Sequence, residues 1–172
     1  MAYFEWVELE SFFSGYLLVY AIFYLLASNR PATNFVKSKL LQKLPLAYAL
    51  VGTFYWGLQL KNLYPDYHGN LLISDLHLHY LRVWGLLSIF FWLPPLHKRA
   101  VFSQLHSLIF FFLLMKDIYL NHFTTSGGSN DARNNIKIFS VSILLNLAAV
   151  FLVVLIGILM AHLKSRKKST PV

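Results

Sequence analysis

The longest uninterrupted apolar segment of the chain covers residues 138–161. These 24 residues include no charged residue, no proline and no histidine. At ~1.5 Å rise per residue, such a helix extends about 36 Å, which exceeds the ~30 Å hydrocarbon core of a bilayer. A helix in a soluble protein is rarely apolar on every face over this length. The pattern therefore predicts a transmembrane helix, with Lys137 before it and a basic tail after His162.

Four further apolar segments qualify as membrane spans, because charged side chains near helix ends can reach the headgroups. Pro31 prevents continuation of the first helix, and Pro45 falls in the first predicted turn of the second, where a missing N–H costs nothing. The sequence therefore predicts a single all-α integral membrane domain, 1–172, built as a bundle of five transmembrane helices. The predicted spans are residues 11–28, 44–60, 76–93, 100–120 and 138–161.

Basic residues divide unevenly between the two sides that five spans would create. One side receives ten Lys and Arg residues and no acid, whereas the other receives five basic residues and all seven acids. Cytoplasmic loops of membrane proteins carry the excess of Lys and Arg. The pattern therefore predicts an N-terminus outside the membrane and a cytoplasmic C-terminus. The ten residues assigned to the cytoplasm are Arg30, Lys37, Lys39, Lys43, Lys98, Arg99, Lys164, Arg166, Lys167 and Lys168.

Composition supports this interpretation and narrows the chemistry. The chain is 57% hydrophobic and 13% charged, whereas soluble domains have about 25% charged residues. Although the net charge is +8, the basic residues flank apolar segments, so the lipid bilayer is the expected partner and nucleic acid is not. The absence of cysteine excludes disulfides, thiolate nucleophiles and thiolate metal sites.

The most polar stretch between two spans covers residues 64–82. In a helix that begins near Asp75, the side chains of Asp75, His79 and Arg82 share one face, and His77 lies on another. Because His and Asp ligate divalent cations, one hypothesis is an outward-facing site for a metal, a proton or another ligand. The favoured alternative is a capped helix start with interfacial histidines, since the spacing matches no zinc motif.

A second pair of titratable residues lies in the predicted span 100–120. His106 and Asp117 fall on one helical face, because eleven residues return a helix to within about 20° of its starting direction. Ionisable groups inside a membrane often serve proton or ion relays. The favoured alternative is that a neutral His106, with Ser103 and Ser107, bonds to a neighbouring helix while Asp117 reaches the outer headgroups.

Histidines also raise the possibility of b-type haem, which needs two of them on facing helices at matching depth. His106 and His162 both lie toward the predicted cytoplasmic side, and His77 or His79 could face His122 on the outer side. Because His122 and His162 lie at the ends of spans rather than inside them, the sequence favours no cofactor.

Two stripes of small and polar residues are typical of helix-packing faces. Small residues let helix backbones approach closely, and an amide can bond across the contact. A substrate pocket beside Asn146 is the alternative interpretation. We expect Gly157 to face a partner helix that any side chain there would push away. The predicted packing residues are Ala49, Thr53, Gly57, Ser142, Asn146 and Gly157.

The chain has no glycine-rich phosphate loop, no HExxH and no GxSxG, which favours a non-enzymatic role. The leading hypothesis is a non-catalytic multi-pass membrane subunit, an accessory, anchoring or assembly component of a larger complex with protein partners in the membrane. The alternatives are a small transporter or ion-conducting protein and a haem-binding electron-transfer subunit. A bacterial cytoplasmic membrane is the expected location, with a eukaryotic membrane as the other option.

Overall fold

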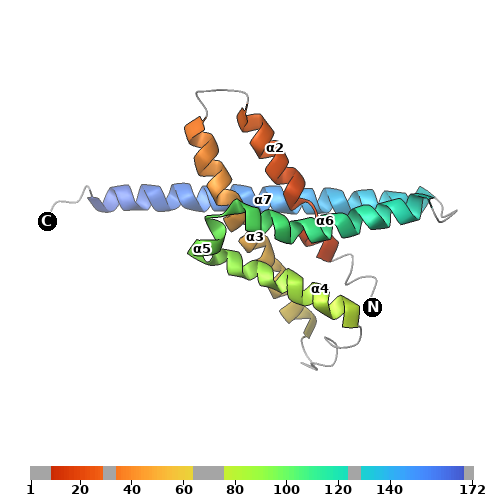
Figure 1. Cartoon of the computed structure of the whole chain (residues 1–172). Helices are drawn as coiled ribbons and strands as arrows, with labels where there is room; N and C mark the ends of the chain where they lie inside the picture. The colour runs from red at the N-terminus through yellow and green to blue at the C-terminus, as the bar shows by residue number, and fades with distance from the viewer. Residues whose placement is uncertain (1–8, 29–33, 64–75, 124–128, 169–172) are drawn as a thin grey trace.

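The computed structural model describes residues 9–28, 34–63, 76–123 and 129–168, and every regular element in these ranges is helical (Figure 1). The predicted all-α class is therefore confirmed. A helical stretch at residues 9–13 precedes the first labelled helix. The elements are α2 (Tyr16–Ser28), α3 (Asn34–Leu63), α4 (Leu76–Leu86), the 3-10 helix η3 (Leu87–Trp92), α5 (Pro94–His97), α6 (Ala100–Phe123) and α7 (Ser129–Lys168).

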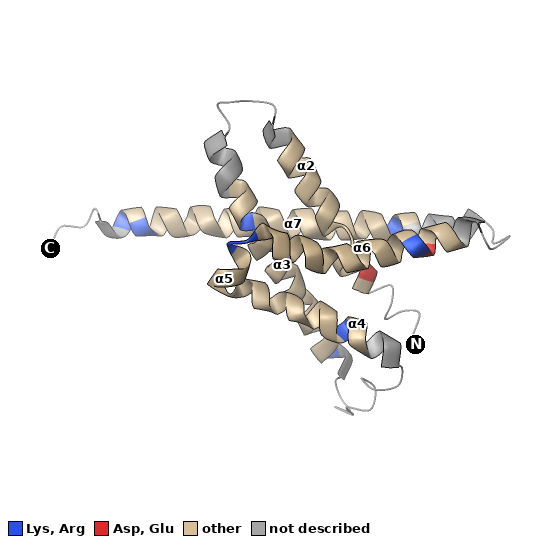
Figure 2. Cartoon of the chain, viewed as in Figure 1, with Lys and Arg blue, Asp and Glu red and all other residues tan. Residues whose placement is uncertain are grey.

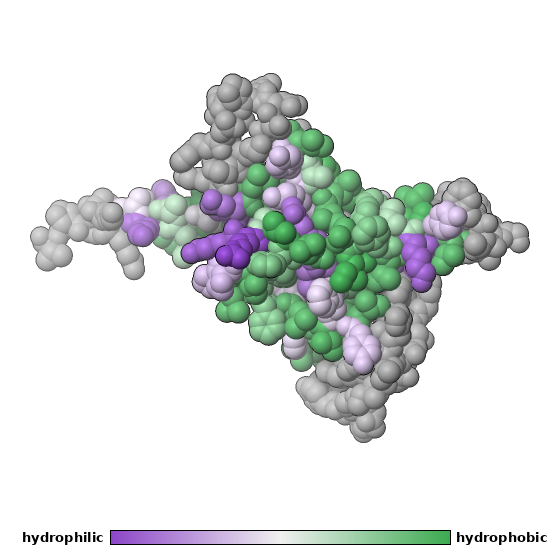
Figure 3. Space-filling view, in the orientation of Figure 1, coloured by the Kyte–Doolittle hydropathy of each residue, from purple (hydrophilic) through white to green (hydrophobic). Residues whose placement is uncertain are grey.

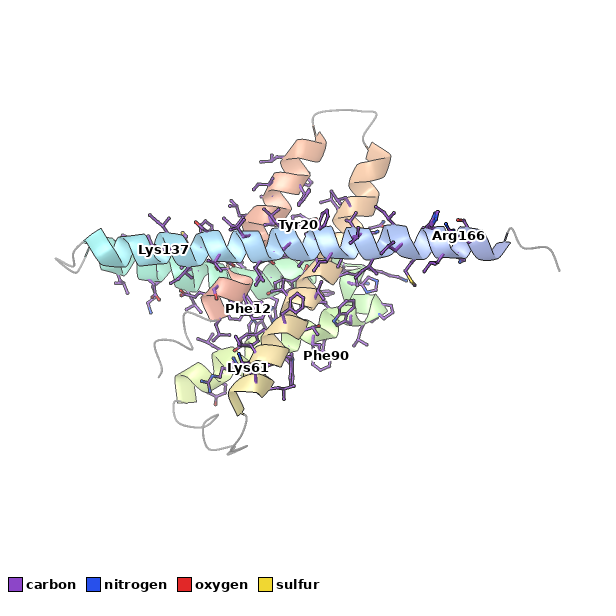
Figure 4. The ribbon with its side chains drawn as sticks, turned by 180° about the vertical axis from the view of Figure 1, so that it is seen from behind. Phe12, Tyr20, Lys61, Phe90, Lys137 and Arg166 are labelled. Carbon is purple, nitrogen blue, oxygen red and sulfur yellow. The ribbon has the colours of Figure 1, made fainter. Side chains whose placement is uncertain are left out.

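Helices α6 and α7 lie side by side in nearly the same direction, and α3 crosses α7 (Figure 1). The N-terminal half of α3 extends with α2 on one side of this pair, and the C-terminal half of α3 extends with α4 on the other (Figures 1 and 4). Helix α3 contacts α2, α4, α5, α6, α7 and η3. It is therefore the central element of the fold.

Two helical segments in the described residues combine the length and apolar character needed to cross a membrane. They are Ala100–Leu120 in α6 and Ile136–Arg166 in α7, which correspond to two predicted spans. Lys137 and Arg166 lie near the two ends of the second segment (Figure 4). The segments Leu9–Leu25 and Tyr80–Trp92 are apolar but shorter. The predicted bundle of five spans is therefore not confirmed.

The boundaries of the other predicted spans differ for local physical reasons. Helix α3 begins at Asn34 rather than at residue 44, so Pro45 lies inside the helix and not in its first turn. The predicted span 11–28 is interrupted by a turn at Ser14 and Gly15. The predicted span 76–93 changes from α4 to the tighter η3 after Leu86, where the Ser88 hydroxyl donates to the Gly85 carbonyl at 2.5 Å.

The core of the fold is aromatic and lies where residues 9–16, α3, η3 and α6 meet. The Tyr16 and Tyr48 rings are 4.3 Å apart, and the Phe13 and Phe110 rings are 4.9 Å apart. Helix α7 contributes Ala149 and Val150 to this core, but most of its large apolar side chains are exposed. Hydrophobic side chains also cover much of the face that Figure 3 shows. The buried rings are Phe13, Tyr16, Tyr48, Tyr55, Phe91 and Phe110.

Candidate functional site

His106 of α6 lies in the centre of the aromatic core and is only 6% exposed. Its Nδ1 atom is 2.7 Å from the Tyr48 hydroxyl of α3, and its Nε2 atom is 2.7 Å from the Trp84 carbonyl oxygen of α4. A carbonyl oxygen only accepts hydrogen bonds, so Nε2 must carry a proton. In a neutral ring, Nδ1 then accepts the proton of Tyr48. The two partners therefore select a single tautomer of His106.

Five aromatic rings surround this imidazole, and together with His106 they form what we call the His106 cluster. Trp84 stacks on the imidazole with ring centroids 5.0 Å apart and planes 10° apart, and its Nε1–H donates to the His106 carbonyl at 3.3 Å. The other rings lie at 5.6 to 6.2 Å. The rings are those of Phe13, Tyr48, Trp84, Phe91 and Phe110.

Two serines flank His106 and also bond to other helices. Ser103 Oγ is 2.9 Å from the Tyr16 hydroxyl of α2, and Ser107 Oγ donates to the Phe13 carbonyl at 2.8 Å. All three polar side chains are buried. This arrangement agrees with the alternative favoured from the sequence, in which His106, Ser103 and Ser107 of α6 form hydrogen bonds to neighbouring helices.

A second polar contact joins α7 to the beginning of the chain. The Gly15 N–H donates to Ser142 Oγ at 2.8 Å, and Asn146 Nδ2 donates to the Phe12 carbonyl at 3.0 Å. The Asn146 amide also donates to the Ser142 carbonyl at 2.8 Å, and its side chain is 1% exposed. Its Oδ1 atom has no hydrogen-bond partner among the described residues. Ser142 and Asn146 therefore lie against another helical segment.

The other predicted packing residues are packed less closely against neighbouring helices. Ala49 is buried, whereas Thr53 is exposed and accepts a hydrogen bond from Trp92 Nε1 at 2.9 Å. A Cβ at Gly57 would meet no described atom within 4 Å, so Gly57 makes no close contact with the described helices of this chain and its packing role stays a prediction. The physical reason for the missing contact is that a four-residue repeat turns about 40° per step relative to a 3.6-residue helix. A Cβ at Gly157 would meet only the flexible end of Lys43.

Three glycines that the sequence analysis did not single out make the close contacts instead. A Cβ at Gly15 would lie 2.7 Å from the backbone of Ser142 and of Ile143 on α7. One at Gly52 would collide with the Ser88 side chain, and one at Gly85 would lie 2.9 Å from a Leu9 methyl carbon. Single glycines within apolar segments were the available signal, because small residues mark close helix approaches in membranes.

The predicted outer cluster is described only in part. Asp75 lies outside the described residues, and His77 and His79 belong to α4 but their side chains are not described. Arg82 is buried, at 6% exposure, and Asp117 is half-buried on α6. Eleven residues separate Asp117 from His106, about 16 Å along the helix, so the structure does not bring these two predicted relay residues together.

The structure describes only some of the side chains that the metal and haem hypotheses involve. Groups of three or more His, Cys, Asp or Glu residues that could hold a metal do not occur within the described ranges. Both ring nitrogens of His106 are engaged, so iron ligation through His106 would require the loss of one of these bonds. His162 is exposed on α7, and the side chain of His122 is not described.

The described interior thus consists of hydrogen bonds and ring contacts that join helices, centred on His106 and on the Gly15–Ser142 contact. The side chains of Ser103, His106, Ser107 and Asn146 each bond to another helical segment. Comparisons of the chain with protein-family models, curated protein sequences and solved structures find no match.

Proposed function

We propose that the chain is a non-catalytic multi-pass membrane subunit, an accessory, anchoring or assembly component of a larger membrane complex. The observation that carries this proposal is the exposed apolar surface of α7. Only 17% of the most apolar stretch within Ile136–Arg166 is buried. Soluble monomers rarely expose so large a continuous apolar surface. Lipid, together with a partner helix, would supply the cover that this surface needs.

The C-terminal part of α7 is the region best placed for a partner. It extends past the other described helices (Figures 1 and 4). Val153 and Val154 pack against the core and Gly157 lies beside Lys43, but large apolar side chains are exposed over most of the remaining circumference. An adjacent helix from another protein would have direct access to it. The exposed side chains are Phe151, Leu152, Leu155, Ile156, Ile158, Leu159, Met160 and Leu163.

In this proposal α6 and α7 are two full spans. The shorter apolar segments Leu9–Leu25 and Tyr80–Trp92, together with the apolar part of α3, complete a five-span topology. The N-terminus lies outside and the C-terminus in the cytoplasm, most simply of a bacterial cytoplasmic membrane. The division of ten basic residues against five supports this orientation.

His106 belongs to both alternative functions, as part of an ion path with the outer cluster and as a member of one of the two predicted haem pairs. It is held by two hydrogen bonds and enclosed by five rings. A histidine that relays protons needs a ring nitrogen that is free to accept a proton, or a neighbouring group with which it can exchange one. No described observation favours either alternative over a structural role for this histidine.

Cysteines placed at Ser129 and Ser165 test the topology, since the two residues lie at opposite ends of α7. We expect the cysteine at position 129 to react with a membrane-impermeant thiol reagent in intact cells and the cysteine at 165 to stay unlabelled. Lysis should expose the second one. The parent chain has no cysteine and provides the blank. Labelling at 165 before lysis would contradict the orientation.

A photo-crosslinking side chain at Phe151 or Ile158 tests the partner. We expect a discrete crosslinked protein from these positions on the projecting part of α7. Phe112 on α6 is a matched control, because its 62% exposure is close to the 67% of Phe151 but it lies on a helix that runs beside α7. Crosslinks to lipid alone at all three positions would contradict the subunit role and leave the membrane location intact.

A further inference from the structure

A cavity of about 490 Å³ opens between α3 and the short helix α5. It is lined by Gln42, Lys43, Leu46, His97 and Lys98. Two lysines and a histidine therefore face one small volume, and no acid lines it. Basic residues lie close together beside α5 in Figure 2, and Figure 3 shows that a hydrophilic patch there borders hydrophobic surface.

The fold creates this concentration of charge from two distant parts of the sequence. Lys43 comes from α3, whereas His97 is the last residue of α5, which begins at Pro94 after a bend at Leu93, and Lys98 follows it directly. The charge analysis assigns Lys43 and Lys98 to the same, cytoplasmic, side. Bringing like charges together is unfavourable unless an anion compensates them.

Lys43 also places its ammonium group against an uncharged part of α7. The side chain ends beside Gly157, in the space that a Cβ there would need. The next basic residue along α7 is Lys164, seven residues or about 10 Å further on. The ammonium group thus lies near the end of the apolar segment of α7, a depth at which lipid phosphates approach a membrane protein.

His97 and Gln42 add groups suited to phosphate oxygens. The buried Nδ1 atom of His97 has no hydrogen-bond partner among the described residues. Ammonium, imidazolium and amide N–H groups all donate to phosphate oxygens, and the charged donors form the stronger bonds. Leu46 supplies an apolar wall. Trp92 and Leu93, immediately before α5, are 44% and 48% exposed and extend apolar surface next to the cavity.

We propose that this cavity binds the phosphate group of an anionic phospholipid. Lys43 and Lys98 pair with the phosphate oxygens, His97 donates a further hydrogen bond, and the acyl chains lie on the adjoining apolar surface. A free phosphate ester shares the same polar chemistry, but it would leave that apolar surface uncovered. The inference concerns a ligand and not a protein partner, so it goes beyond the subunit role proposed above.

The test uses the full chain in neutral detergent, with dioleoyl phosphatidic acid titrated into mixed micelles and the melting midpoint recorded at each concentration. A ligand that binds the folded state raises this midpoint by mass action. We expect a saturable rise with phosphatidic acid and none with dioleoyl phosphatidylcholine or with glycerol 3-phosphate. The double variant Lys43→Gln/Lys98→Gln should need on the order of tenfold more phosphatidic acid.

The matched control is Lys61→Gln/Lys116→Gln, which removes two exposed lysines outside the cavity. It should respond to phosphatidic acid as the parent does. An equal loss in this control, or no response in the parent, would overturn the cavity as a site. An equal rise with glycerol 3-phosphate would overturn the lipid as its source. If the double variant has a lower melting midpoint than the parent without lipid, the single variant Lys98→Gln, at an exposed position, is compared with the parent instead. A negative result in this lipid test does not affect the prediction that Phe151 contacts a partner protein.

Discussion

Replacing Gly15 with alanine is expected to destabilise the protein, although alanine is the better helix former. A Cβ at this position would lie 2.7 Å from the Ile143 nitrogen and from the Ser142 carbonyl carbon, both backbone atoms of α7. No side-chain rotation can relieve such a contact, so the two segments must move apart. Overpacking of this kind costs about 1–3 kcal/mol, and weakening the bond from the Gly15 N–H to Ser142 Oγ adds roughly 1 kcal/mol.

Gly57→Ala is the matched control for this prediction. A Cβ at Gly57 meets nothing within 4 Å among the described residues, so only helix propensity acts there, and it favours alanine by up to about 1 kcal/mol. The two identical substitutions should therefore shift the melting midpoint in detergent in opposite directions. Equal shifts would contradict the close approach of Gly15 to α7. Gly157→Ala should be mild, because the flexible Lys43 side chain can move away.

His106→Leu is the second change with a large expected effect. It removes the imidazole of the His106 cluster, and with it the 2.7 Å contacts that this ring makes to the Tyr48 hydroxyl and to the Trp84 carbonyl. An unsatisfied buried polar group costs about 1–3 kcal/mol, so the loss should be roughly 2–5 kcal/mol in total. The melting midpoint and the fluorescence of Trp84, which stacks on the ring, provide the measurement.

A double-mutant cycle separates the Tyr48 bond from general packing. Tyr48→Phe removes the donor to His106 Nδ1 and keeps the ring contacts, so it should cost about 1–2 kcal/mol. The double variant should lose less stability than the sum of the two single losses, because no orphaned hydroxyl remains. Leu105→Ala, on the exposed side of α6, is the control and should change little. Fully additive losses would show that Tyr48 and His106 do not interact.

Local features of the chain were enough to predict its helical class and the two segments that are long and apolar enough to cross a membrane. The predicted span 100–120 matches Ala100–Leu120, and the predicted span 138–161 lies within Ile136–Arg166, because hydropathy summed along a helix needs no knowledge of its neighbours. The polar stripe of α6 could also be predicted, since Ser103, His106 and Ser107 share one helical face. The ends of the other helices were less predictable. At Gly15 the backbone bonds to Ser142 of another helix, and at Leu87 the chain changes to a tighter 3-10 helix.

Only the tertiary structure decided which faces meet. In a chain that is apolar on nearly every face, hydropathy does not distinguish a buried side from a lipid-facing one, so Gly57 and Gly157 were chosen and Gly15 was not. The packing of the first helical segment on α7 brings Gly15 against Ser142 and Ile143, and the steep crossing of α3 over α7 (Figure 1) places Lys43 beside Gly157. The same crossing and the turn into α5 bring Lys43 to His97 and Lys98, because proximity between distant residues depends on helix packing and not on local pattern.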